Sequence, residues 1–182
     1  MTENGKETSM RSGKSARSLW RMFGPAAVAM LSVACLAAAS PPVPVAVVDF
    51  DYTDTSGEPR NQTAEHAARL AAFVKTLRSD LAATGRFQPV EIACAAPPCT
   101  AGNTPAPALI DAAKTAGARL LVYGGIEKMS TLIQWGKLQI VDLQADRLLD
   151  DKMLSFRGDS DDAWRRAEVF VVEEIKGLDL SK

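Results

Sequence analysis

The chain alternates between short apolar runs and longer amphipathic segments, and this order restricts the folds it can adopt. Residues 43–50 form a nearly continuous apolar run, rich in valine, which is typical of a strand buried on both faces. After a polar loop at 51–62, apolar residues recur with helical spacing over 70–81. Two more strands are predicted at 86–92 and 119–123, with a short helix between them. Because helices separate successive strands, we expect right-handed crossovers and a parallel sheet.

The remainder of the chain has a different pattern. Apolar and polar residues alternate over 127–158, with a turn near Ala145, which indicates antiparallel strands. A last amphipathic helix is predicted from Asp161 to Lys176, with Ser160 or Asp159 as its cap. We therefore predict an α/β fold over residues 43–178, in two or three layers, whose mixed sheet has about five strands with three helices. The sheet would combine a parallel core with an antiparallel hairpin.

Residues 1–39 have the composition of an export signal or an amino-terminal membrane anchor. Basic residues precede an apolar run, and the small residues Ala37 and Ala39 suit cleavage by a signal peptidase. Three outcomes stay open: cleavage after Ala39, lipidation of Cys35 in a loose lipoprotein-type sequence, and retention as an anchor through residues 23–39. Each of these outcomes predicts a bacterial protein of the cell envelope, either periplasmic or secreted. Lipidation or retention would also anchor the protein to a membrane at its amino terminus.

Charge and cysteine usage exclude several classes of protein. Acidic residues outnumber basic ones after residue 39, so binding to nucleic acid has no electrostatic support. Cys94 and Cys99 lie in a proline-containing loop, and their spacing is not that of a CxxC motif. The single histidine, His66, lies on another element. We therefore expect a disulfide between Cys94 and Cys99, with no metal site and no cofactor.

The acidic residues after the first strand are the strongest candidates for catalysis. Asp49, Asp51 and Thr53 form an Asp-x-Asp-x-Thr sequence that resembles the first motif of the haloacid-dehalogenase-like hydrolases. In that chemistry Asp49 would attack phosphorus, Asp51 would protonate the leaving group and Mg²⁺ would offset the charge. The strand at 119–123 ends in Tyr and two glycines, where such hydrolases need Ser or Thr. A Mg²⁺-dependent periplasmic phosphohydrolase using Asp49 and Asp51 is therefore the alternative function.

Binding without catalysis is the leading hypothesis. Ligands of open α/β sheets gather at the carboxyl ends of strands, so the candidate surface combines the loop after the first strand, the cysteine loop and the end of the third strand. The binding candidates there are Asp49, Asp51, Asp54, Gly124 and Gly125, and Trp135 on the alternating segment is a further candidate. The two glycines would let a ligand approach the backbone or let the strand bend. Trp135 would be exposed on a binding face or buried under the last helix, and His66 would be exposed or would cap its helix.

Several segments resemble a family of small exported bacterial proteins known as a domain of unknown function (number 2380). These segments are "VAVVDFDYTDTSGE", "EHAARLAAFVKTLRSDLAATGRF", the cysteine loop, "GARLLVYGGIEKMSTLI" and "FRGDSDDAWRRA". The family is similar to the amino-terminal domain of TolB and related envelope assembly proteins, which have a compact α/β fold and no enzymatic activity. The resemblance implies a binding or assembly module with an envelope protein as partner. It also implies that Asp159, Asp161 and Asp162 cap the last helix and that Trp164 anchors it to the sheet.

Overall fold

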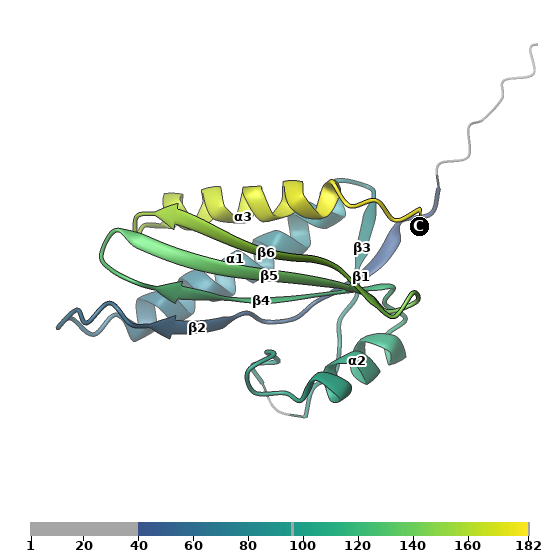
Figure 1. Cartoon of the computed structure of the whole chain (residues 1–182), viewed down its shortest axis with the longest axis horizontal. Helices are drawn as coiled ribbons and strands as arrows, with labels where there is room; N and C mark the ends of the chain where they lie inside the picture. The colour runs from purple at the N-terminus through teal and green to yellow at the C-terminus, as the bar shows by residue number, and fades with distance from the viewer. Residues whose placement is uncertain (1–39, 96, 182) are drawn as a thin grey trace, which may run out of the picture. The chain divides into compact units, whose positions relative to one another are not determined.

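A computed structural model describes residues 40–95 and 97–181 of the chain, so the expected export segment at 1–39 lies outside the described residues. Within them, six strands and three helices follow one another along the chain (Figure 1). In order they are β1 (Val43–Val47), β2 (Asp51–Asp54), α1 (Thr63–Ala83), β3 (Phe87–Pro89), α2 (Ala106–Thr115), β4 (Leu120–Lys128), β5 (Ile133–Asp142), β6 (Arg147–Arg157) and α3 (Asp161–Lys176).

The strands form one mixed sheet, in the order β3-β1-β4-β5-β6, and β2 also pairs with β4. β1 runs parallel to β3 and to β4, and β2 runs parallel to β4. β5 is antiparallel to both β4 and β6. The predicted α/β fold, with a parallel core and an added antiparallel hairpin, is therefore confirmed.

The strand expected at 43–50 is divided in two, and this division adds a strand to the sheet. Val47 of β1 lies opposite Val122, and Asp51 of β2 lies opposite Gly125. The three residues 48–50 therefore lie opposite only two residues of β4, 123 and 124. The extra residue between β1 and β2 forms a bulge. The prediction of a loop beginning at residue 51 was wrong, because the polar β2 can pair with β4 while its outer side chains meet water.

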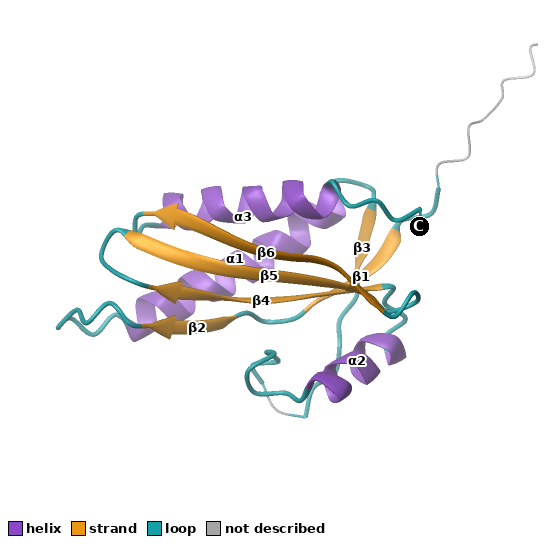
Figure 2. Ribbon diagram, viewed as in Figure 1, coloured by secondary structure: helices purple, strands orange, loops and turns teal. Residues whose placement is uncertain are grey.

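Two apolar clusters lie on opposite faces of the sheet. Alternate residues of β1 and the segment after it point to opposite sides, as the period of a strand requires. Val45 and Val47 join the cluster beneath α1 and α3, whereas Ala46 and Val48 join the cluster beneath α2. Figure 2 shows α1 and α3 together along the strands, with the shorter α2 apart from them. The domain therefore has three layers where α2 lies and two layers along the rest of the sheet.

The start of α3 is fixed by a cap and by an aromatic cluster. Ser160 is the N-cap, and its Oγ accepts a hydrogen bond from the Ala163 N–H. The Trp164 ring is buried, and it contacts the rings of Tyr52, Phe73 and Phe156 on β2, α1 and β6. One indole therefore joins α3 to the other helix of its layer and to two strands of the sheet.

Candidate functional site

Asp49 and Asp51 hold the cysteine loop against the bulged strand. The Asp49 carboxylate accepts a hydrogen bond from the Cys99 N–H at 3.0 Å, and the Asp49 N–H donates to the Cys99 carbonyl. The Asp51 carboxylate accepts the Gly102 N–H at 2.9 Å. Arg78 of α1 lies 3.4 Å from the other carboxylate oxygen of Asp49. Both carboxylates thus have partners within the chain, and their contacts give them the role of fixing a loop.

The cysteine loop is closed on itself as well as held by the strand. Cys94 and Cys99 are joined, with their Cα atoms 5.7 Å apart. Because the disulfide closes a short loop and the Asp49 backbone and side chain bind Cys99, this end of the loop is held against the strand.

Asp54 is the last residue of β2, and its carboxylate binds within the turn that follows. Its carboxylate accepts hydrogen bonds from the Oγ and the N–H of Ser56. The Ser56 hydroxyl is the main reason that the pKa of Asp54 lies below its ordinary value. Asp54 therefore shapes the turn after β2, and it does not join the other two aspartates in one cluster.

The two glycines of β4 have different surroundings. A Cβ atom at Gly124 would lie 2.1 Å from the Lys137 carbonyl oxygen and 3.0 Å from the Phe50 ring, so Gly124 permits the close approach of β5 and the packing of Phe50. A Cβ atom at Gly125 would lie 3.3 Å from the Cβ and carbonyl oxygen of Asp51. Only Gly125 opens onto the face of the sheet that carries Trp135.

A hollow of about 240 Å³ lies over Gly125, on the face of the sheet opposite α1 and α3. Gly125, Lys137 and Met153 are register partners on adjacent strands, and Trp135 is on the same side of β5 as Lys137. Asp51 of β2 lines the same hollow. We call Asp51, Gly125, Trp135, Lys137 and Met153 the sheet face. Three of the predicted binding residues are therefore brought together, while Asp49, Asp54 and Gly124 lie outside the hollow.

The sheet face combines exposed apolar side chains with charge. Trp135 is 43% exposed and Met153 is 62% exposed. The Lys137 Nζ lies 3.6 Å from a carboxylate oxygen of Asp151, and Asp51 lines the same hollow as Lys137. Of the two positions expected for Trp135, the exposed one is therefore correct.

A buried polar network lies at the carboxyl end of β4, near the starts of α1 and α3. It was not predicted from the sequence. The Lys128 side chain is fully buried, and its Nζ lies 3.0 Å from Glu58, 3.0 Å from Asp159 and 2.6 Å from Gln62. The other end of the network is His66, whose Nε2 lies 2.8 Å from the Asp159 carboxylate. The network thus ties β4 to the start of α1 and to the residues that precede α3.

Hydrogen bonds outweigh burial in setting the charges of this network. Burial alone would raise the pKa of Asp159, but the bonds from His66 and Lys128 hold it below its ordinary value. Burial alone would lower the pKa of Lys128, but the bonds to Asp159 and Glu58 raise it above its ordinary value. The pair is therefore a charged contact inside the domain, where removal of one partner is costly.

The network corrects two expectations. His66 is 1% exposed, so the prediction of an exposed histidine or a capping histidine was wrong. Of the two caps expected for α3, Ser160 is correct and Asp159 is wrong, because the Asp159 carboxylate binds His66, Lys128 and Arg69 instead. One signal in the sequence does point to the burial of Lys128: it follows Ile126 with the period of a strand, on the side that faces the helices.

The described part of the chain has neither a metal-binding cluster nor a helix that could span a membrane. Residues 40–95 and 97–181 contain no group of three or more His, Cys, Asp or Glu side chains that could hold a metal ion. No helix among these residues is both long enough and apolar enough to cross a membrane.

Comparison with known proteins supports the fold more than the function. No curated protein matches the sequence. A hypothetical protein from Chlamydia trachomatis has a similar structure, with a TM-score of 0.53 and 14% identity over 74% of this chain and 96% of that chain. TolB from Acinetobacter baumannii gives a TM-score of 0.46 and 18% identity over 74% of this chain. A lipoprotein from Neisseria meningitidis gives a TM-score of 0.47 and 17% identity over 75% of this chain and 98% of that chain.

The family model, unlike the solved structures, identifies the family of this chain. The match spans only 27% of the length of TolB, and identities this low speak for the fold alone. The family model described as "Protein of unknown function (DUF2380)" matches residues 43–175, which are nearly all of the α/β domain. The chain therefore belongs to the DUF2380 family of proteins of unknown function.

Proposed function

We propose that this protein is an exported, non-enzymatic binding or assembly module of the bacterial cell envelope, and that a partner protein docks on its sheet face. The observation that carries the proposal is the exposed Trp135 at the edge of the hollow over Gly125. Tryptophan is enriched among the residues that dominate interface energies, particularly where a neighbouring pocket can be filled. A protein segment that places an apolar side chain in the hollow would cover Trp135 and Met153 together.

The border of the sheet face suits this role. Asp49 and Asp51 fix the cysteine loop through backbone hydrogen bonds, so a partner would meet a surface that is already ordered. Asp51 and Lys137 line the hollow with opposite charges, and these charges would set the orientation of the partner. We assign Asp54 and Gly124 to the shape of this end of the sheet, and we place direct contacts at Asp51, Gly125 and Trp135.

The proposed location rests on the cysteine pair and on residues 1–39. Disulfides persist in oxidising compartments such as the periplasm, and Cys94 and Cys99 are joined. We propose that residues 1–39 act as a signal peptide or an amino-terminal anchor, followed by the α/β domain from residue 43. Mass spectrometry of the mature amino terminus separates cleavage after Ala39, lipidation of Cys35 and retention of the segment.

Recovery of partners from envelope extract tests the docking surface. Tagged full-length protein, Trp135→Ala and Phe170→Ala would each be used to recover bound proteins. Phe170 is a matched control, because it is 46% exposed on α3 and lies outside the sheet face. We expect Trp135→Ala to lose a partner that Phe170→Ala retains. Equal recovery by both variants would contradict the proposed surface.

The same preparation tests the alternative function. The wild-type protein and Asp49→Asn would be assayed with a generic phosphate ester and Mg²⁺. Because Asp49 binds the backbone of the cysteine loop, we expect no turnover that depends on its charge. Turnover that the substitution abolishes would show a phosphohydrolase and would overturn the non-enzymatic assignment.

A further inference from the structure

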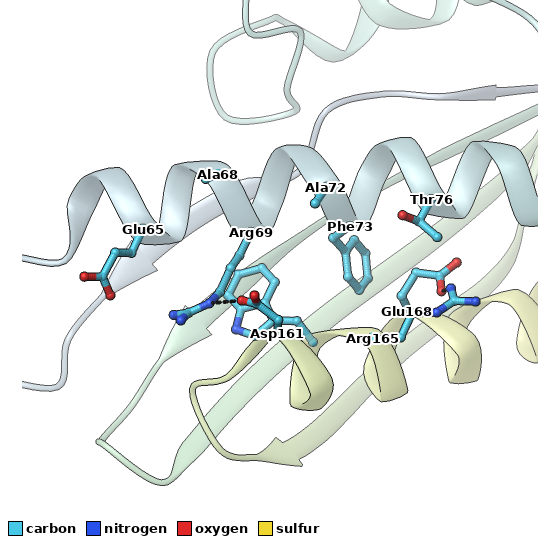
Figure 3. Close-up of a pocket in the computed structure, with 10 residues that line it drawn as sticks. Glu65, Ala68, Arg69, Ala72, Phe73, Thr76, Asp161, Arg165 and Glu168 are labelled. Atoms are coloured by element: carbon cyan, nitrogen blue, oxygen red, sulfur yellow. Dashed lines mark hydrogen bonds and ion pairs between the residues drawn. The ribbon is translucent and has the colours of Figure 1, made fainter.

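A groove of about 430 Å³ lies between α1 and α3, on the face of the domain opposite the sheet face (Figure 3). Phe73 and Trp164, both buried, form its apolar floor, and the small side chains of Ala68 and Ala72 leave it open from the α1 side. The volume is within the range of sites that hold small molecules or single side chains of a partner.

One end of the groove holds a buried carboxylate with an unused oxygen. Glu168 of α3 is 1% exposed, and one of its carboxylate oxygens pairs with Arg165. Arg165 is shared with Asp80 of α1, at 2.8 Å. The other oxygen of Glu168, Oε1, is buried without a hydrogen-bond partner. Figure 3 shows Glu168 in the space between the helices, beside Thr76 and Arg165.

An unpartnered carboxylate oxygen in an apolar groove is an unfavourable arrangement. A buried polar atom without a partner costs free energy, and folded proteins contain few of them. Trp164 also lines the groove, and its Nε1 is buried without an acceptor. Two lining residues that each have a buried polar atom without a partner indicate a ligand that carries polar groups on an apolar body.

We propose that the groove binds a lysine side chain of a partner protein, with its methylene stem over Phe73 and Trp164 and its ammonium group donating to Glu168 Oε1. The other Glu168 oxygen is engaged by Arg165, so a single oxygen is left to accept. An ammonium group binds as a compact point charge, whereas a guanidinium group fits a carboxylate best through both oxygens. The aromatic floor would also attract the cation.

The ionisation of Glu168 gives the interaction a defined pH dependence. Burial raises the pKa of Glu168 to about 7, while Arg165 lowers it and Asp80 raises it. The charged groups that face Glu168 are Arg165 on α3 and Asp80 on α1. An ammonium group binds the ionised carboxylate, so binding strengthens as the pH rises through 7 and Glu168 loses its proton.

Titration of the full-length protein with capped amino acids tests the proposal. N-acetyl-lysine methylamide would be compared with the norleucine and arginine analogues, and binding would be followed through the indole N–H signal of Trp164 in NMR spectra. At pH 8 we expect the lysine probe to move this signal and to bind about tenfold more tightly than either analogue. Equal binding by lysine and norleucine would overturn the proposal, since the apolar groove alone would then explain it.

Two variants give the experiment its controls. Glu168→Gln keeps the size of the side chain, and we expect it to weaken binding of the lysine probe by about tenfold or more. Glu173→Gln, on the same helix at an exposed site, should leave binding unchanged. Undiminished binding by Glu168→Gln, or no movement of the Trp164 signal in the wild type, would refute the site. Tighter binding of n-butylammonium than of the lysine probe would assign the groove to a small amine and overturn the partner lysine.

The wild-type comparison of lysine with norleucine stands even if a variant folds poorly. The proposal concerns a different face from the one that carries Trp135, so failure here leaves the sheet-face proposal intact.

Discussion

Replacement of Lys128 by methionine should strongly destabilise the domain. The side chain is fully buried, and its Nζ lies within 3.0 Å of oxygens of Glu58, Gln62 and Asp159. Methionine keeps the length of the apolar stem but removes the charge and all three donors. Because Glu58 and Asp159 would both lose the buried ammonium group that they share, we expect Lys128→Met to lower the free energy of unfolding by about 3–5 kcal/mol.

Urea denaturation of the full-length protein measures this loss, with Lys137→Met as the matched control. Lys137 is half exposed and lies 3.6 Å from Asp151, so its removal should cost about 0–1 kcal/mol. The double variant Lys128→Met/Asp159→Asn should cost less than the sum of its single variants, because both residues act in one network. A cost for Lys128→Met no larger than that of Lys137→Met, or strict additivity with Asp159→Asn, would refute the account of the network.

The pH dependence gives a second check on the same network. The pKa of Asp159 is lowered in the folded state, so its contribution to stability is present above the unfolded pKa and is lost as the pH falls through the folded pKa. The pKa of Lys128 is raised, so its contribution is lost only as the pH rises through that raised value. The difference in stability between the wild type and Lys128→Met should therefore shrink in acid. A difference that stays constant down to the acid range would contradict the pairing.

Three further outcomes are expected. Gly124→Ala should destabilise the protein by about 1–3 kcal/mol in urea, because the new Cβ would overlap the Lys137 carbonyl; wild-type stability would contradict this. Cys94→Ser should lower the free energy of unfolding by about 2 kcal/mol under oxidising conditions, because it opens the short loop that the bond to Cys99 closes, and it should have no effect in reductant. The folded pKa of Glu168 is raised, so wild-type stability should fall between pH 4.5 and about 7, and urea denaturation of Glu168→Gln should show a smaller fall.

The parts of the fold that follow from local patterns were predictable from the sequence. The helical spacing of Leu70, Phe73 and Leu77 predicted α1, and all three side chains face the sheet or lie close to it. The alternation around Leu138 and Ile140 predicted antiparallel strands, and both residues are fully buried in β5. These predictions succeeded because burial of one face fixes the period of an element whatever its neighbours are.

The parts that depend on tertiary pairing were not predictable in the same way. β2 is polar, and it is a strand only because β4 extends far enough to pair with it. Lys128 and Asp159 are far apart in the sequence, and nothing in either local pattern names the other as a partner. A charged residue is normally expected at the surface, and the burial of Lys128 depends on partners that only the tertiary fold brings together.

The candidate site was only partly predictable from the sequence. The sequence pattern placed Asp51 and Gly125 after predicted strands and Trp135 in the alternating segment, and the pairing of β2, β4 and β5 brings them to one hollow. The exposure of Trp135 required knowledge of which face α3 covers. That choice depends on the packing of Trp164 against α1 and the sheet, which no short segment specifies.

Site-directed photocrosslinking in cells that make the full-length protein tests the central claim most directly. A photoreactive amino acid would replace Met153 on the sheet face or, in a separate variant, Phe170 on α3, and both positions are exposed. Docking on the sheet face predicts a defined crosslinked partner from position 153, and its loss when Trp135→Ala is added. A partner captured from position 170 and not from position 153 would contradict the claim.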